Sequence, residues 1–307
     1  MIHTRLVRLI IAVVLTAATA GLCPTYGQDR GTFAMPDSVV LFANPDQELR
    51  VINGPTVQKI ERSDSLGRFF PAALSPDGRH VAWAIPLETQ GAHARSRFAL
   101  GVSPTTRQER TAYGDFEGVG VAEFSPDGSK VAFVAKPTGV MILDLASGKM
   151  EATPKPPPTP MQTNLGWSPD GKRLVMEAYR DEQTSIVSIV DLSSGDVRAI
   201  GNGHSPSWSP TGDWIAYFDQ SWEKCVVVHP DATGSRVVRN IAGNFFSPYR
   251  QFVYRAVWSP DGTRLLLNEM KGERGSIDVM LLDLTSGNVT RKSKNGLIVL
   301  GWVNQKH

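Results

Sequence analysis

A carboxylate recurs along this 307-residue chain inside a nearly constant string of four residues. Asp77, Asp127, Asp170 and Asp261 each stand in Ser-Pro-Asp-Gly, and a further copy at residues 209–212 reads Ser-Pro-Thr-Gly. Repeated carboxylates could bind metal ions or act as general acids and bases. No histidine or second carboxylate stands at a fixed distance from these aspartates, so we expect neither a catalytic residue nor a metal ligand among them.

The same string has the chemistry of a tight turn. Proline sets φ to about −65° at the second position, Asp or Thr can bond nearby backbone groups, and Gly accepts positive φ at the last position. These residues are therefore expected to be structural. The turn residues so predicted are Asp77, Gly78, Asp127, Gly128, Asp170, Gly171, Gly212, Asp261 and Gly262.

The turn string marks an internal repeat. Its serines fall at positions 75, 125, 168, 209 and 259, and an apolar run follows each copy. A second string, Asp-Leu-x-Ser-Gly, recurs at residues 144–148, 191–195 and 283–287. Two turn strings in a repeat of this length are typical of a β-propeller blade, which is built from four short strands.

The two ends of the repeat region complement each other. Residues 297–304 read as a first strand, with Trp302 where other copies carry Trp, and the chain then ends. Residues 39–42, 49–52 and 57–60 read as second, third and fourth strands without a first. We therefore predict an all-β protein over residues 38–307. It is a six-bladed β-propeller with four antiparallel strands per blade, closed by a C-terminal strand that joins three N-terminal strands.

Residues 1–27 have the pattern of a secretory signal peptide. Arg5 and Arg8 give a basic start, and residues 9–22 are almost all apolar or small. This run is too short for a comfortable membrane span. We expect an exported protein, periplasmic or extracellular, with residues 28–37 as a short N-terminal segment and no membrane span in the mature chain.

The processing of this leader has alternatives. Cleavage after Ala20 and cleavage after Gly27 both suit the sequence, and Gly27 is preferred. Lipid attachment at Cys23 is disfavoured because the large Leu22 precedes it. An uncleaved N-terminal anchor is the remaining alternative.

Charge and cysteine content narrow the function classes. Without residues 1–27 the chain carries 30 basic and 30 acidic residues, because only Arg5 and Arg8 are lost. Nucleic-acid binders usually have a clear basic excess, so no nucleic-acid partner is expected. Cys225 then remains alone in an apolar run and is expected to be a buried, inert thiol. We expect a monomer with no cofactor.

The repeats resemble the TolB-like six-bladed propellers of bacterial envelopes. The resemblance rests on the Trp/Phe-Ser-Pro-Asp-Gly string, the strand after it and the Asp-Leu-x-Ser-Gly turn, and it covers residues 38–304. It implies an envelope scaffold that binds a protein partner. TolB carries a separate α/β domain before its propeller, whereas we expect only residues 28–37 between the cleavage site and the first strand here, so the contacts of that domain are not expected.

A search for enzymatic motifs is negative. Residues 203–207 read Gly-His-Ser-Pro-Ser, which lacks the last glycine of the nucleophile elbow G-x-S-x-G. His204 is expected just before a first strand, and no two histidines stand at metal-ligand spacing. We therefore expect a protein that is not an enzyme.

The predicted binding site lies on the face opposite to the Ser-Pro-Asp-Gly turns, where the loops are longer and more varied. Aromatic residues and arginine are the types that anchor interfaces. The predicted rim consists of Phe69, Phe70, Tyr113, Phe116, Trp222, Phe245, Phe246, Tyr249 and Arg250. Packing of these rings beneath their own loops is the alternative.

Two functions follow from these observations. The first is a non-enzymatic scaffold that binds a protein or peptide partner at the rim, and residues 153–160, rich in proline, are then a stiff connector or a docking peptide. The second is a carbohydrate- or small-ligand-binding propeller, lyase- or lactonase-like, that uses the mouth of the central channel. Histidines and carboxylates converging in a deep funnel would favour the second function.

Overall fold

The computed structural model describes residues 38–43, 49–53, 56–61, 73–87, 97–105, 109–153, 162–181, 184–241, 255–271, 276–293 and 298–304. This part of the chain is made of strands and turns and contains no helix, which confirms the all-β prediction. None of its elements is therefore a helix long and apolar enough to cross a membrane. The predicted leader, residues 1–27, and the segment 28–37 lie outside the described residues.

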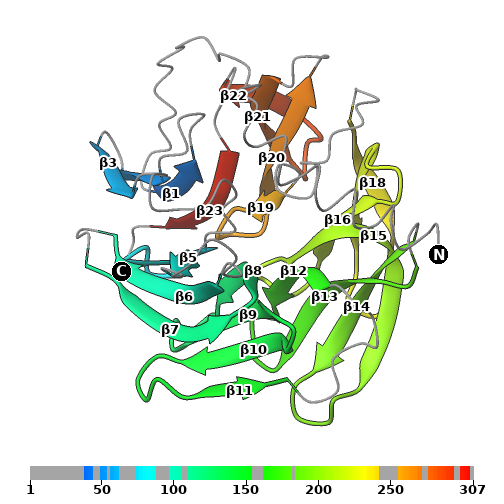
Figure 1. The fold of residues 1–307 in the computed structure, drawn as a ribbon. Helices are drawn as coiled ribbons and strands as arrows, with labels where there is room; N and C mark the ends of the chain where they lie inside the picture. Colours follow the sequence, from blue (N-terminus) through cyan, green and yellow to red (C-terminus); the bar gives the residue numbers. More distant parts are fainter. Residues whose placement is uncertain are drawn as a thin grey trace, which may run out of the picture.

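The strands form antiparallel sheets around a common centre (Figure 1). One sheet, in spatial order, contains β23 (Ile298–Asn304), β1 (Ser38–Ala43), β2 (Leu49–Asn53) and β3 (Thr56–Glu61). The next contains β4 (Ala73–Leu74), β5 (His80–Leu87), β6 (Arg97–Pro104) and β7 (Thr111–Phe116). A third contains β8 (Gly118–Phe124), β9 (Lys130–Lys136), β10 (Gly139–Asp144) and β11 (Met150–Ala152).

The remaining strands form a long sheet and a short one. The seven-stranded sheet runs in chain order through β12 (Gln162–Trp167), β13 (Arg173–Tyr179), β14 (Ser185–Asp191), β15 (Val197–Trp208), β16 (Ile215–Asp219), β17 (Lys224–Val228) and β18 (Arg236–Asn240). The last sheet contains β19 (Ala256–Trp258), β20 (Arg264–Lys271), β21 (Ser276–Asp283) and β22 (Val289–Ser293). The 12-residue β15 pairs with β14 through its first half and with β16 through its second, so it serves two consecutive four-stranded units.

The core lies between the faces of neighbouring sheets. Leu100 and Leu143, from two consecutive sheets, are fully buried in one apolar cluster, and Val175 and Ile215 are fully buried in another. A sheet that is covered on both faces needs apolar residues on both sides of its strands. This explains why the second strands read as continuous apolar runs, as in Leu265, Leu266 and Leu267.

The innermost strands contact one another in a cycle. β4 contacts β8, β8 contacts β12, β12 contacts β15, β15 contacts β19, β19 contacts β23, and β23 contacts β4. These strands line the centre of the molecule, and β8 and β19 stand three steps apart in either direction around the cycle.

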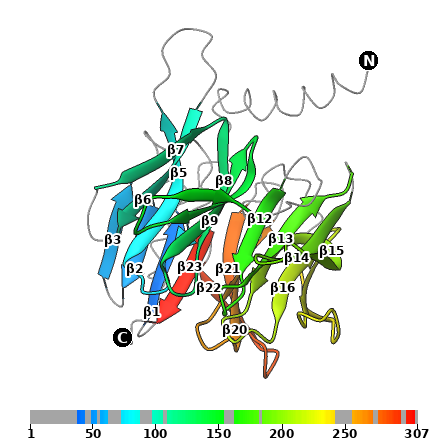
Figure 2. The ribbon, with the colours of Figure 1, turned by 90° about the horizontal axis from the view of Figure 1, so that it is seen from below.

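The predicted pairing of the two chain ends is confirmed. β23 pairs antiparallel with β1, with Val40 opposite Trp302 and Ala43 opposite Ile298. Figure 2 shows the red β23 beside the blue β1. The C-terminal strand is thus the first strand of a sheet whose other three strands come from the beginning of the described chain.

A buried amide also holds β23. Asn268, on β20, is 1% exposed; its Nδ2 donates to the backbone oxygen of Val299 at 3.2 Å, and its Oδ1 accepts from the Val299 N–H at 3.1 Å. A buried amide bonded on both sides ties the closing strand to the preceding sheet.

Indole N–H groups connect neighbouring sheets in the same way. Trp167 Nε1 donates to the backbone oxygen of Glu123 at 3.1 Å, and Trp258 Nε1 donates to that of Ser207 at 3.2 Å. In both cases the acceptor stands two residues before the turn serine of the preceding repeat. Trp167 and Trp258 therefore each supply an inter-sheet hydrogen bond that Phe124, at the equivalent position, cannot make.

Deletion of residues 297–307 tests the importance of this closure. The deletion removes β23, exposes the edge of β1 and leaves the Asn268 amide without Val299. We expect a large drop in melting temperature and loss of a single cooperative transition, measured by circular dichroism. Deletion of residues 305–307 alone is the matched control, and equal melting of the two proteins would contradict the prediction.

Candidate functional site

The turn carboxylates are engaged within their own turns. The hydroxyls of Ser75, Ser125 and Ser259 donate to the aspartate two residues later, each at 2.5 Å. The backbone N–H two residues beyond each aspartate donates to the same carboxylate. Burial alone would raise the pKa of Asp261, but hydrogen bonds from Ser259 and Thr263 outweigh it and lower this pKa to about 2.

The turn glycines adopt the left-handed conformation. The φ angles of Gly78, Gly128, Gly171 and Gly262 lie between 67° and 72°, and that of Gly212 is 86°. Backbone in this region favours glycine, because a Cβ atom is strained there. The turn string thus has a complete structural explanation at these positions.

A cavity of about 410 Å³ lies at the centre of the molecule, on the side of these turns. Its wall is formed by inner-strand residues such as Leu74, Val257 and Val303, together with turn prolines. Pro126 and Pro210 are exposed and border its outer end. A mainly apolar wall and a volume of a few hundred Å³ are typical of ligand-binding pockets.

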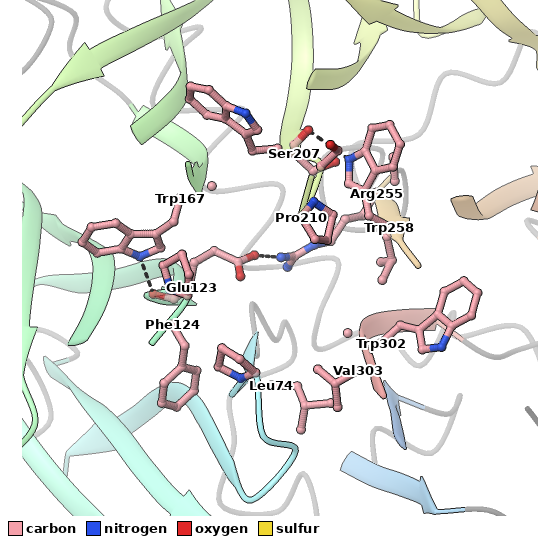
Figure 3. A pocket seen from close by; sticks show the side chains of 18 of the residues that line it. Leu74, Glu123, Phe124, Trp167, Ser207, Pro210, Arg255, Trp258, Trp302 and Val303 are labelled. Atoms are coloured by element: carbon pink, nitrogen blue, oxygen red, sulfur yellow. Dashed lines mark hydrogen bonds and ion pairs between the residues drawn. The ribbon is translucent and has the colours of Figure 1, made fainter. Parts of the chain in front are cut away.

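One ion pair bridges this cavity. The Glu123 carboxylate, from β8, and the Arg255 guanidinium, directly before β19, point toward each other across the centre (Figure 3). The two residues come from opposite sides of the inner-strand cycle, since β8 and β19 lie three steps apart. The indole rings of Trp167, Trp258 and Trp302 point away from the cavity in the same view.

Both members of the pair are partly accessible. The Arg255 side chain is 21% exposed and the Glu123 side chain 19%. Desolvation lowers the pKa of Arg255 to about 10, so its guanidinium is still charged at neutral pH. The cavity therefore contains a charged guanidinium that is paired with Glu123 and is partly exposed.

A second polar cluster lies at the other end of the sheets and is buried. Glu177, near the end of β13, is fully buried, and its carboxylate accepts from Asn164 Nδ2 at 2.8 Å, from the Ser205 N–H at 3.0 Å and from His204 Nδ1 at 2.9 Å. Ser185 Oγ lies 3.4 Å from the same carboxylate. Burial alone would raise the pKa of Glu177, but the hydrogen bonds from His204, Ser205 and Asn164 outweigh this effect, so the net pKa lies below its ordinary value.

The hydrogen-bond network defines the tautomer of His204. The Ser185 N–H donates to Gln220 Oε1 at 3.1 Å, which orients the amide so that Nε2 donates to His204 Nε2 at 3.2 Å. The ring proton is then on Nδ1, where it is donated to Glu177. Because these groups are hydrogen-bonded to one another, Glu177 and His204 stabilise the junction of two consecutive four-stranded units of the seven-stranded sheet.

The rim residues of the described chain are packed against the core. Trp222 stands in the turn between β16 and β17, as predicted, and stacks on His204 with ring centroids 4.3 Å apart. The expected loop at residues 113–116 is wrong, because Tyr113 and Phe116 belong to strand β7. The Phe116 ring meets Phe133 edge-on at 5.6 Å, and this apolar contact keeps the segment in the sheet.

The other predicted positions are distributed as follows. Phe69, Phe70, Phe245, Phe246, Tyr249 and Arg250 lie outside the described residues, as do residues 154–160 of the proline-rich segment. His204 was expected before an inner strand and instead lies within β15, because that strand continues without interruption into the next unit. Cys225 is buried, and burial raises its pKa to about 12, as expected for an inert thiol.

Glu123, Arg255 and Glu177 were missed, although an alignment of the repeats contains a signal for them. The residue two places before the turn serine is Glu123 in one copy, but Ala73, Gly166, Ser207 and Val257 in the others. Arg255 and Glu177 are similarly unusual for their places in the repeat. Within the described residues, no three His, Cys, Asp or Glu side chains are grouped to hold a metal ion.

Replacing Glu177 by Gln tests the buried cluster. In wild type, both carboxylate oxygens of Glu177 accept hydrogen bonds. The glutamine side chain would place an NH₂ group opposite one set of these donors, and leaving buried donors unpaired costs about 1–3 kcal/mol. We expect this loss in urea unfolding at pH 7, while Glu151→Gln, at an exposed site, leaves the stability unchanged.

The same variant gives a pH test. A lowered folded-state pKa adds stability above the ordinary glutamate value of about 4.3, and this stability is lost as the pH falls toward the folded value. The difference between wild type and Glu177→Gln should therefore shrink below about pH 4. A difference that is constant from pH 7 to pH 3 would contradict this account.

Comparison with known proteins identifies only structural likeness. No family model matches the chain, and no curated protein matches it in sequence. TolB from Acinetobacter baumannii is 15% identical over 89% of this chain and 68% of that chain, with a TM-score of 0.66. A putative TolB from Agrobacterium tumefaciens is 18% identical over 85% and 91% of the two chains, with a TM-score of 0.60. An oligogalacturonate lyase in complex with manganese is 13% identical over 75% and 72%, with a TM-score of 0.53. At these identities the likeness concerns the fold, which is a TolB-like propeller.

Proposed function

We propose that this protein is an exported six-bladed β-propeller that binds a protein or peptide partner in the cell envelope without catalysing a reaction on it. The cycle of contacts among β4, β8, β12, β15, β19 and β23 supports six blades around one channel. The basic and apolar pattern of residues 1–27 supports export. The likeness to TolB structures supports a scaffold role.

The central cavity is the observation that carries the binding function. It is open at the turn face, has mainly apolar walls and contains the ion pair of Glu123 with Arg255. Among the described residues, Glu177 and His204 could form an acid–base pair, but they lie in the buried cluster and are hydrogen-bonded there. A pocket with one charged anchor and an apolar wall is suited to recognition.

The predicted aromatic rim remains a proposed second contact surface at the opposite end. Trp222, a member of this rim, contacts the buried Glu177 cluster through its stack on His204. A partner that covers this end would meet Phe246, Tyr249 and Arg250 if the loop containing them contributes to the rim as the sequence predicts.

The likeness to oligogalacturonate lyase favours one alternative function. By this alternative the protein would cleave an acidic oligosaccharide with the help of a manganese ion. The described part of the central cavity contains Glu123 and Arg255 but no histidine, so it lacks the convergence of histidines and carboxylates that the sequence analysis set as the criterion for this function.

Affinity capture from the native envelope with residues 28–307 tests the proposal. We expect a protein partner whose retention falls at least about tenfold when Pro126 and Pro210 are both changed to Glu at the cavity mouth. Changing Val237 to Glu, on an exposed part of β18, is the control and should have no effect.

Two further arms separate the alternatives. Alanine at Phe246, Tyr249 and Arg250 tests the rim, and unchanged retention would remove it from the proposal. Incubation with oligogalacturonate and Mn²⁺, monitored by the ultraviolet absorbance of an unsaturated product, tests the lyase. Turnover in this assay, together with no retained partner, would overturn the scaffold function.

A further inference from the structure

We propose that the central cavity binds a ligand carboxylate at Arg255, and that Glu123 occupies this place when no ligand is bound. The ligand class is a monocarboxylate attached to an apolar group. This inference rests on the proposed binding function and gives its central cavity a chemical specificity.

The geometry provides a prepared carboxylate site. An arginine guanidinium offers a planar set of donors that matches a carboxylate, and Glu123 already occupies that set from the far side of the channel. The Glu123 backbone is held by the hydrogen bond from Trp167 and by its place in β8 opposite Ala132. The backbone of Glu123 is therefore held in place, and a change of its side-chain rotamer is all that is needed to release Arg255.

Exchange is possible because the pair is not sealed. With Glu123 19% and Arg255 21% exposed, water reaches both groups, and a released Glu123 carboxylate can be solvated. Because the incoming carboxylate takes the place of Glu123 on the guanidinium, Arg255 keeps an anionic partner, and the cost of exchange is that of hydrating the released Glu123 carboxylate. The incoming ligand replaces that bond and also contacts the apolar wall.

The wall determines the rest of the ligand. Leu74, Val257 and Val303 line the cavity close to the ion pair, and the 410 Å³ volume is larger than a phenyl group with a short acid chain. One guanidinium compensates one negative charge, so a singly charged carboxylate suits the cavity better than a doubly charged phosphate. The C-terminal carboxylate of a peptide with an apolar last residue and a free apolar acid share this chemistry.

The sequence context supports a specific role for Glu123. The equivalent positions in the neighbouring repeats are Ala73 and Gly166, and Ser207 stands there in the repeat after Gly166; none of these side chains can span the channel. A glutamate is therefore not required by the repeat, and the fold tolerates small residues at this place. The Glu123–Arg255 pair joins opposite sides of a cavity that is large enough for a ligand. A ligand carboxylate that competes with Glu123 for Arg255 gives this arrangement a function.

The test uses 3-phenylpropionate and N-acetylphenylalanine as probes, with the corresponding neutral amides as controls. Isothermal titration calorimetry of residues 28–307 compares wild type, Glu123→Gln and the double variant Glu123→Gln/Arg255→Gln. The tethered Glu123 carboxylate competes at a high effective concentration. We therefore expect Glu123→Gln to bind the acids at least about tenfold more tightly than wild type, and the double variant to lose this gain.

Melting curves show whether each variant is folded. If Glu123→Gln is not, Glu123→Ser takes its place, since serine stands at the equivalent position 207. Tighter binding of N-acetylphenylalanine than of 3-phenylpropionate supports a peptide terminus, and the reverse order supports a free acid; both outcomes support the carboxylate site.

Three outcomes overturn the inference. They are equal affinity of acids and amides for Glu123→Gln, equal affinity of wild type and Glu123→Gln for the acids, and undiminished binding by the double variant. None of these uses the captured partner, so failure of the carboxylate site leaves the scaffold function to be decided by the capture experiment.

Discussion

The pairing of β23 with β1 is the constraint on which the rest of the structure depends. It brings the end of the chain into a sheet with its beginning, so that β23 contacts both β19 and β4. Asn268 reinforces the pairing by bonding both backbone groups of Val299. Without β23 the inner-strand contacts would form an open row with exposed edges, and the central cavity would lose the wall supplied by Val303.

A similar buried polar group joins two consecutive four-stranded units of the seven-stranded sheet. Glu177 and Asn268 occupy equivalent positions, because each stands nine residues after the turn serine of its repeat. Glu177 accepts the backbone N–H of Ser205, and Asn268 accepts that of Val299. These two donors are also equivalent, each four places before the next turn serine or the residue that replaces it. Buried polar groups in this fold thus tie one four-stranded unit to the next. The Glu123–Arg255 pair differs, because it joins opposite sides of the centre and is partly exposed.

Much of the fold could be predicted from the sequence because the turn string constrains the backbone directly. Pro and Gly define the hairpins, and the absence of the string after Trp302 identifies the closing strand. The predicted loop at Tyr113 and Phe116 was wrong because their glycine and polar neighbours suggested a turn, whereas packing of Phe116 on Phe133 favours a strand.

The candidate site was harder to predict. Glu123 and Arg255 are 132 positions apart in sequence and belong to different repeats, so no local pattern connects them. Their meeting depends on how many units surround the channel, which places β8 opposite β19. The surroundings of His204 could not be predicted either. They are formed by Gln220 and Trp222 of the next hairpin, and sequence spacing alone does not show that these residues meet.

Hydrogen–deuterium exchange of residues 28–307, with and without the captured partner, tests most directly whether the molecule binds through its centre. The account predicts slower exchange of backbone amides in the turns that border the cavity, at residues 125–130, 168–173 and 209–214, and no change in the outer strands β11 and β22. Protection confined to the outer strands, with the cavity turns unchanged, would contradict it.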